Sequence, residues 1–192
     1  MTTTMNRRTF AGLTLAATGG LSACAVPDPL GEDLPPMGDF ELAFTVVVSE
    51  NAKKIPPSRS TTPEKLKEVM AAEVERRFGR YRGGKGYVIA INIDGYALAP
   101  PGIPVVLTPK SIMVVSANLW SADPQKKLAG PEQITTFEGA DTMLVGSGLV
   151  KDADEQLVTL SRNMVKKVQS WLLRNPEWFG LPARPKPSVP KE

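Results

Sequence analysis

Residues 40–48 read Phe-Glu-Leu-Ala-Phe-Thr-Val-Val-Val (FELAFTVVV), and this stretch decides the interpretation of the fold. Apolar residues recur at every second position, and a β-strand places such residues on one face of its sheet. The residues expected on that face are Phe40, Leu42, Phe44, Val46 and Val48. The pattern therefore predicts a half-buried strand with its apolar face toward the core.

The segment that follows this strand predicts a helix. Thr61 or Thr62 can cap its N-terminus, and Pro63 suits the first turn of a helix. Gly79 is a typical residue at a helix C-terminus. The apolar residues between these ends recur at helical spacing and are expected to face the core: Leu66, Val69, Met70, Val74 and Phe78.

The rest of the chain predicts more strands and a second long helix. Apolar residues alternate over residues 87–93 and again over residues 113–119, which indicates two strands. A further strand is expected near residues 134–138, and residues 143–145 are a short additional candidate. The last helix is expected at about residues 152–174, where apolar residues again follow helical spacing.

These elements give the order β-α-β-β-(β)-α. We expect a two-layer α+β domain over residues 39–179, with a mostly antiparallel sheet and both helices on one face. This element order resembles the small α+β modules of envelope-associated lipoproteins and of secretion or assembly accessories. The resemblance rests on no motif and implies no site residue. Residues 24–38 are rich in proline and glycine and predict a tether, and residues 180–192 predict a disordered tail.

Residues 1–23 have the composition of an export signal. Arg7 and Arg8 form a positive region, and residues 10–21 are mostly apolar. This apolar run of about a dozen residues is shorter than the roughly 20 that a membrane-spanning helix needs. Gly19 and Gly20 favour an extended conformation before the end of the signal. We therefore expect this segment to be removed from the mature protein.

The residues at the end of this signal, Leu21-Ser22-Ala23-Cys24, resemble the lipobox of bacterial lipoproteins at all four positions. The resemblance implies that the sulfur of Cys24 receives a diacylglycerol and that cleavage leaves Cys24 as the first residue. It also implies acylation of the new amino group. Several acyl chains anchor a protein stably, whereas one chain gives only marginal binding. The alternative is an ordinary signal peptide in which Cys24 occurs by chance.

The residues Asn6-Arg7-Arg8-Thr9-Phe10 also resemble the twin-arginine export motif. The alternative is that Arg7 and Arg8 supply only the positive region that any export signal carries. Ala25 rather than aspartate follows Cys24. Within the lipoprotein resemblance, this implies an anchor in the outer rather than the inner membrane, with the domain facing the periplasm.

Charge and composition exclude several classes of function. The formal net charge is +3, and removal of Arg7 and Arg8 leaves 21 basic and 20 acidic residues, or +1. A nearly neutral chain does not predict nucleic-acid binding. The chain contains no histidine, which excludes Ser-His-Asp and Cys-His nucleophiles and histidine-containing zinc sites. One cysteine cannot form an internal disulfide bond.

Two glycine-rich segments resemble nucleotide-binding loops in part. Residues 79–86 (GRYRGGKG) have the glycines and lysine of a phosphate-binding loop, but Gly86 stands where Ser or Thr would bind magnesium. A helix is also expected before this loop rather than after it. Residues 146–148 precede a helix whose acidic first turn would repel a phosphate. We therefore predict turns at both places and no cofactor.

Other polar residues give no catalytic pattern. The hydroxyls of residues 58–62 precede a helix, where hydroxyls usually act as caps. The carboxylates of Asp94, Asp123, Glu138 and Asp141 have no spacing that brings two of them together. The sequence therefore predicts no catalytic residue and no metal site.

The connection at residues 97–107 is apolar and contains three prolines, although connections are normally polar and exposed. One interpretation is that this segment folds back on the core. The other is an exposed contact surface in which Ile103, Val105 and Leu107 bind a partner. Trp178 and Phe179 present the same choice, and for them we expect packing in the core.

Two functions remain compatible with these features. The first is a lipid-anchored envelope protein, without enzymatic activity, that binds a protein partner as an accessory or scaffold. The second is a periplasmic module that binds a lipid or another apolar small molecule between its helices and its sheet. A hydrolytic enzyme is the third and least supported possibility, because the chain lacks a recognisable catalytic group.

Overall fold

The computed structural model describes residues 34–100, 111–137 and 152–183, which belong to one compact unit beginning at Leu34. The strands are β1 (Phe40–Val48), β2 (Lys53–Lys54), β3 (Lys85–Ala97), β4 (Ile112–Ser121) and β5 (Lys126–Phe137). The helices are α1 (Pro63–Phe78), α3 (Ala153–Leu173) and the short 3₁₀ helix η2 (Pro176–Phe179).

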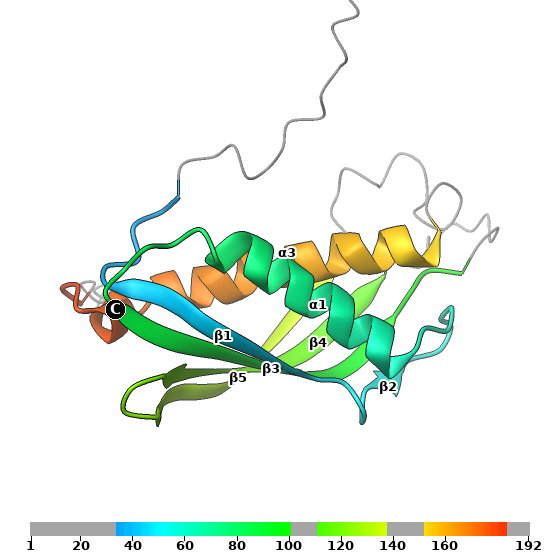
Figure 1. Ribbon diagram of the computed structural model, residues 1–192. Helices are drawn as coiled ribbons and strands as arrows, with labels where there is room; N and C mark the ends of the chain where they lie inside the picture. Colours follow the sequence, from blue (N-terminus) through cyan, green and yellow to red (C-terminus); the bar gives the residue numbers. More distant parts are fainter. Residues whose placement is uncertain (1–33, 101–110, 138–151, 184–192) are drawn as a thin grey trace, which may run out of the picture. The chain divides into compact units, whose positions relative to one another are not determined.

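The five strands form one sheet in the order β1-β3-β4-β5, and β2 pairs with β3 next to the end of β1. The β1–β3 pair is parallel, whereas the β3–β4 and β4–β5 pairs are antiparallel. Figure 1 shows α1 and α3 on the same face of this sheet, and no described element lies on the opposite face. The predicted two-layer α+β class is therefore confirmed. We refer to the uncovered side as the open face.

Both long helices begin and end at the predicted residues. The Thr62 side chain accepts a hydrogen bond from the Lys65 amide at 3.2 Å, and Pro63 is the first residue of α1. Asp152 and Glu155 form a reciprocal capping box at the start of α3. In the described part of the chain, no helix is long and apolar enough to cross a membrane.

The core between helices and sheet is anchored at one end by aromatic rings around Phe40. Its ring lies 5.3 to 5.9 Å from the rings of its neighbours, which are Phe78, Tyr81, Tyr87 and Phe179. Phe179 is 1% exposed, as expected, and the partly buried Trp178 packs against Trp171. Met37 is also buried and Leu34 packs against the core, so the domain includes residues that composition assigns to the tether.

The predicted inward face of β1 is correct for the first part of the strand and wrong for the rest. Phe40 is buried, but Phe44, Val46 and Val48 are exposed, and Val47 enters the core instead. The cause is a β-bulge between Leu42 and Phe44. One extra residue in a strand reverses which side chains face the core, because side chains alternate with a period of two.

Strand β5 is much longer than the sequence pattern predicts. The alternation near residues 134–138 marks only its last residues, and the strand already begins at Lys126. Gly130 has a φ of 98° and precedes Pro131, and the register between β4 and β5 shifts close to this point. The irregularity interrupts the inward and outward alternation, so the first half of the strand carries no periodic signal.

Candidate functional site

The exposed apolar side chains of β1 are the most conspicuous feature of the open face. Phe44 is 48% exposed, Val46 40% and Val48 39%. The three residues point away from the helices, since Val47 between them is buried in the core. We call these three residues the β1 stripe. Apolar residues gathered in this way on a surface mark an interaction site more often than isolated ones do.

The neighbouring strands extend the β1 stripe across the open face. Phe44 pairs with Val88 of β3, which in turn pairs with Trp120 of β4. Val46 pairs with Ala90. Paired residues of adjacent strands point to the same side of a sheet, so these side chains form contiguous apolar rows. Val88 is only 4% exposed because the larger side chains on both sides cover it.

Polar residues lie on the same face toward the end of β3, where it pairs with the first half of β4. The Asp94 carboxylate accepts hydrogen bonds from Asn92 Nδ2 at 2.6 Å and from Ser116 Oγ at 2.8 Å. Each of the two carboxylate oxygens therefore has a partner from the same face. These two hydrogen bonds orient Asp94. The apolar rows on the open face end at this polar group.

The two edges of the sheet differ in how they are protected. At β5, Lys167 Nζ donates to the carbonyl oxygen of Thr135 at 2.8 Å, and Asn163 Nδ2 donates to that of Phe137 at 3.4 Å. Strand β5 also carries Lys126 and Lys127 at its start. Lysines, proline and covering side chains are the means by which proteins prevent pairing at a sheet edge. The β5 edge is therefore protected.

The opposite edge is formed by β1 and, beyond it, by the two lysines of β2. Strand β1 itself contains neither lysine nor proline, and its single charged residue is Glu41. Glu75 of α1 reaches this strand and accepts a hydrogen bond from Thr45 Oγ1 at 2.7 Å. Glu50 follows the strand and is fully exposed, and hydrogen bonds from its own and the Ser49 amide lower the pKa of its carboxyl group. The β1 edge is thus apolar and bordered by carboxylates.

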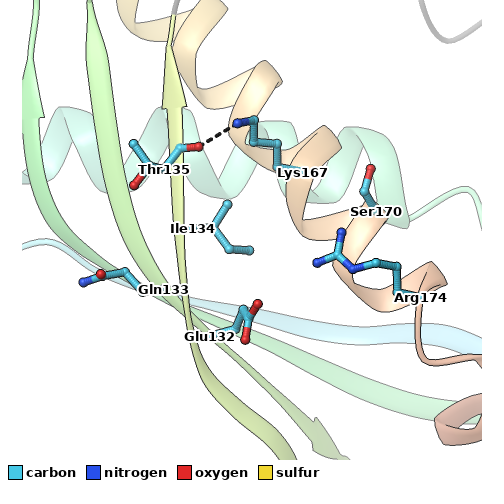
Figure 2. Close-up of a pocket in the computed structure, with 7 residues that line it drawn as sticks. All are labelled: Glu132, Gln133, Ile134, Thr135, Lys167, Ser170 and Arg174. Atoms are coloured by element: carbon cyan, nitrogen blue, oxygen red, sulfur yellow. Dashed lines mark hydrogen bonds between the residues drawn. The ribbon is translucent and has the colours of Figure 1, made fainter. Parts of the chain in front are cut away.

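A second surface feature is the groove between β5 and α3 shown in Figure 2. Its volume is about 310 Å³. Lys167 and Arg174 lie on its helix side and Glu132 lies on its strand side. The remaining lining residues are Gln133, Ile134, Thr135 and Ser170. Because most of these side chains are polar or charged, the groove is a poor match for an apolar ligand.

A set of polar contacts joins α1 and the turn after it to α3. Glu73 of α1 is buried and bonds to Arg76 at 2.7 Å and to Arg162 of α3 at 3.3 Å. Gln169 of α3 donates to the Tyr81 hydroxyl at 2.7 Å. Burial raises the pKa of Tyr81, and the hydrogen bond from Gln169 opposes this rise. These contacts fasten α1 to α3 and serve the fold.

Residues 79–84 of the glycine-rich segment form the predicted connection between α1 and β3, and Lys85 and Gly86 already belong to β3. The Gly84 amide donates to Asp39 Oδ1 at 2.7 Å, and Lys85 Nζ lies 3.9 Å from Asp39 Oδ2. A Cβ atom on Gly83 would overlap the backbone of Asp39. The glycine is therefore explained by a close backbone contact.

Several of the hydroxyls and carboxylates singled out from the sequence make structural contacts. Ser58 Oγ accepts from the Leu98 amide at 2.9 Å and Thr62 caps α1. Asp94 and Asp123 lie toward opposite ends of the β3–β4 pair. Glu138 and Asp141 lie outside the described residues. Among the residues that the structure describes, no group of three or more Asp, Glu, Cys or His could hold a metal ion.

Most other sites predicted from the sequence lie outside the described residues. These are the signal residues Arg7, Arg8, Leu21, Ser22 and Ala23, the lipidation site Cys24, and the loop residues Ile103, Val105 and Leu107. The start of the apolar connection is described, and Leu98 there is fully buried. The first residues of this segment therefore pack in the core, as one of its two interpretations expects.

The chain matches no family model, and no curated protein is similar to it in sequence. Solved structures with a similar arrangement include the PelC dodecamer from Paraburkholderia phytofirmans, with 12% identity, 72% of this chain and 91% of that chain covered, and a TM-score of 0.38. A candidate lipoprotein from Caulobacter crescentus has 12% identity, 77% and 96% covered, and a TM-score of 0.39. A DUF330-family protein from Xanthomonas campestris has 16% identity, 69% and 88% covered, and a TM-score of 0.34. At these TM-scores the similarity supports no conclusion about function or assembly.

Proposed function

We propose that the chain is a lipid-anchored protein of the bacterial cell envelope that binds another protein, without catalysis, through the β1 stripe and the adjoining apolar rows of the open face. The observation that carries this proposal is the exposure of Phe44, Val46 and Val48. Burial of such a side chain from full exposure contributes about 1.5–3 kcal/mol, and because these three are less than half exposed, a covering partner would supply at most about half of that for each.

The anchor is the second part of the proposal. It rests on the lipobox at residues 21–24, with Cys24 as the acylated first residue of the mature protein. Ala25 favours the outer membrane, and the domain would face the periplasm. Residues 25–33 would then link the lipid to the folded unit, which begins at Leu34. Such an anchor concentrates the β1 stripe at the membrane surface, near partners that are held there too.

Two other functions find less support in the described residues. An enzyme needs groups poised for reaction, whereas Ser58, Thr62 and Asp94 serve as a cap or make structural hydrogen bonds. A binding site for an apolar small molecule needs an apolar pocket, and the groove between β5 and α3 is mostly polar. Protein binding through the open face remains the function that the geometry favours.

Site-specific photo-crosslinking in the native envelope tests the proposal. A photoreactive phenylalanine derivative would replace Phe44 in one variant and Ser170, which lines the groove beside α3, in another. We expect one discrete protein adduct from position 44 and none from position 170. An adduct from position 170 alone would assign binding to the groove, and the absence of adducts from both positions would reject protein binding at either surface.

A further inference from the structure

We propose that the partner adds a β-strand to the β1 edge, through an extended segment whose side chains are apolar on the open face and basic on the helix side. This inference rests on the proposed function and specifies how the partner binds. In such a complex the main-chain hydrogen bonds provide much of the affinity, and alternate side chains provide the specificity.

The first argument is the exposed backbone of β1. In the described sheet, β1 is hydrogen-bonded to β3 on one side and to no strand on the other. Its nine residues are long enough for a full added strand. An edge strand presents a row of backbone N–H and C=O groups that match another extended chain. This geometry selects an extended segment over a helix as the occupant.

The second argument is that β1 has fewer protective features than the other edge segments, since these are limited to the bulge at Ala43 and the charge of Glu41. The β5 edge has lysines, Pro131 and hydrogen bonds from α3 to its carbonyl groups. Beside β1, the short strand β2 consists of Lys53 and Lys54, both exposed. Stronger protection of these other edge segments, next to an apolar strand without lysine or proline, is the pattern expected when one edge is kept for a partner.

The third argument concerns the side chains of the added strand on the open face. They would lie beside Phe44, Val46 and Val48, which are exposed along the whole second half of β1. Pairs of aromatic and β-branched residues across adjacent strands are favourable in sheets. Apolar residues at every second position of the partner segment would therefore bury the β1 stripe.

The fourth argument concerns charge on the helix side of the edge. Thr45 faces that side and holds the exposed Glu75 at 2.7 Å, directly above the strand. Glu50 follows the end of β1, whereas Glu41 alternates with the buried Phe40 and is exposed on the open face. Lys67 contributes an opposing charge near Glu50. The remaining negative charge favours lysine or arginine on the partner segment next to Glu75.

The same charges disfavour a second copy of this chain as the occupant. Antiparallel pairing of two β1 strands about Phe44 would place Thr45 of each copy near the centre and bring the two Glu75 carboxylates together on the helix side. Like charges placed together at an interface oppose association. The lysines of β2 limit how far a basic partner segment can extend along the edge, because they repel its positive charges beyond the end of β1. The partner segment should therefore align with residues 40–48 and end before β2.

A peptide experiment with the full chain in detergent micelles tests the inference. The probe is a blocked nine-residue peptide in which valine and lysine alternate. One control peptide has glutamate in place of lysine, and another carries N-methyl groups on every second amide, which prevents pairing along one edge. We expect the valine–lysine peptide to bind and to slow hydrogen exchange in residues 40–48 but not in residues 126–137. The N-methylated peptide should not bind, and the glutamate peptide should bind about 10-fold more weakly.

A pair of charge variants completes the test. Glu75→Lys should weaken binding of the valine–lysine peptide about 3- to 10-fold and strengthen binding of the glutamate peptide. Glu68→Lys changes an exposed residue of the same helix by the same charge and should alter both affinities less than twofold. Equal effects of the two variants would overturn the basic preference.

Three other results would overturn strand addition itself. These are protection at β5 instead of β1, binding without protection in residues 40–48, and protection of residues 40–48 that grows with protein concentration in the absence of peptide. The last result would identify a second copy as the occupant. If the adduct from position 44 forms in the envelope while strand addition fails, the proposed function stands and only the binding mode is rejected. If that adduct is also absent, both are rejected.

Discussion

Leu42 and Phe44 are two positions apart in β1, yet their side chains lie on opposite faces of the sheet. Leu42 pairs with Tyr87 and Phe44 with Val88, so two steps along β1 correspond to one step along β3. Ala43 is the extra residue. Because of this bulge Phe40 and Val47 both reach the core although they are seven positions apart, an offset that places two residues on opposite faces of a regular strand. The β1 stripe therefore faces solvent.

A matched pair of isosteric variants tests the bulge. Val47→Thr places a hydroxyl group in the core and should lower the free energy of unfolding by about 1–3 kcal/mol. Val46→Thr makes the same chemical change on the open face and should stay within about 0.5 kcal/mol of the parent. Urea denaturation measures both. The reverse order of the two effects would show that β1 follows the regular alternation without a bulge.

Removal of the Glu73 carboxylate should weaken the contact between α1 and α3 and lower the free energy of unfolding. Glu73→Ala leaves Arg76 and Arg162 without their shared partner, and we expect a loss of about 1–3 kcal/mol in the free energy of unfolding. Glu68→Ala, at an exposed position of α1, is the control and should change stability by at most about 0.5 kcal/mol. A double-mutant cycle with Arg162→Ala should give a favourable coupling energy. Additive effects of the two substitutions would show that the Glu73–Arg162 contact contributes nothing to the free energy of unfolding.

The buried tyrosines predict a loss of stability at high pH. Burial raises the pKa of Tyr81 and of Tyr87 in the folded state, whereas an unfolded tyrosine ionises near pH 10. Stability from the neutral hydroxyls is therefore complete below about pH 10 and is lost as the pH rises through the raised pKa values. The free energy of unfolding should fall over this range. The fall should be less steep in Tyr87→Phe, and an unchanged slope would contradict the prediction.

Lipidation depends on Cys24 if residues 21–24 are a lipobox. Cys24→Ser removes the thiol that would accept the diacylglycerol. Metabolic labelling with an alkyne fatty acid should mark the parent chain and not the variant, and the variant should accumulate as precursor or as released protein. Lipid label on Cys24→Ser would refute the assignment.

The export route is tested by replacing Arg7 and Arg8 together with lysine. Twin-arginine export requires the arginines themselves, so this double variant should remain inside the cell although its charge is unchanged. Fractionation of cells measures the outcome. Normal export would show that the arginines act only as the positive region of a general signal.

Local sequence patterns determined much of the architecture. Thr62, Pro63 and Gly79 delimit α1, and Asp152 starts α3, because capping and helix termination act within a few residues. The alternation of residues 87–93 and 113–119 likewise predicted the central strands, which pair over most of their length in regular register. The α+β class followed from the order of these elements.

The exposure of the β1 stripe could not be predicted from local sequence patterns. Regular alternation assigned Phe44, Val46 and Val48 to the core, and no sequence pattern marks Ala43 as an extra residue. The bulge exists because Phe40 and Val47 both pack against the core, and that packing involves residues far away in the chain. Gly130 and Pro131 concealed the first half of β5 for a similar reason, since a register shift is a property of two paired strands. The sequence by itself therefore determined which segments form helices and strands and supplied the export and lipidation motifs. The tertiary structure alone decided which face of β1 is exposed and which edge of the sheet is protected, because both depend on contacts between distant segments.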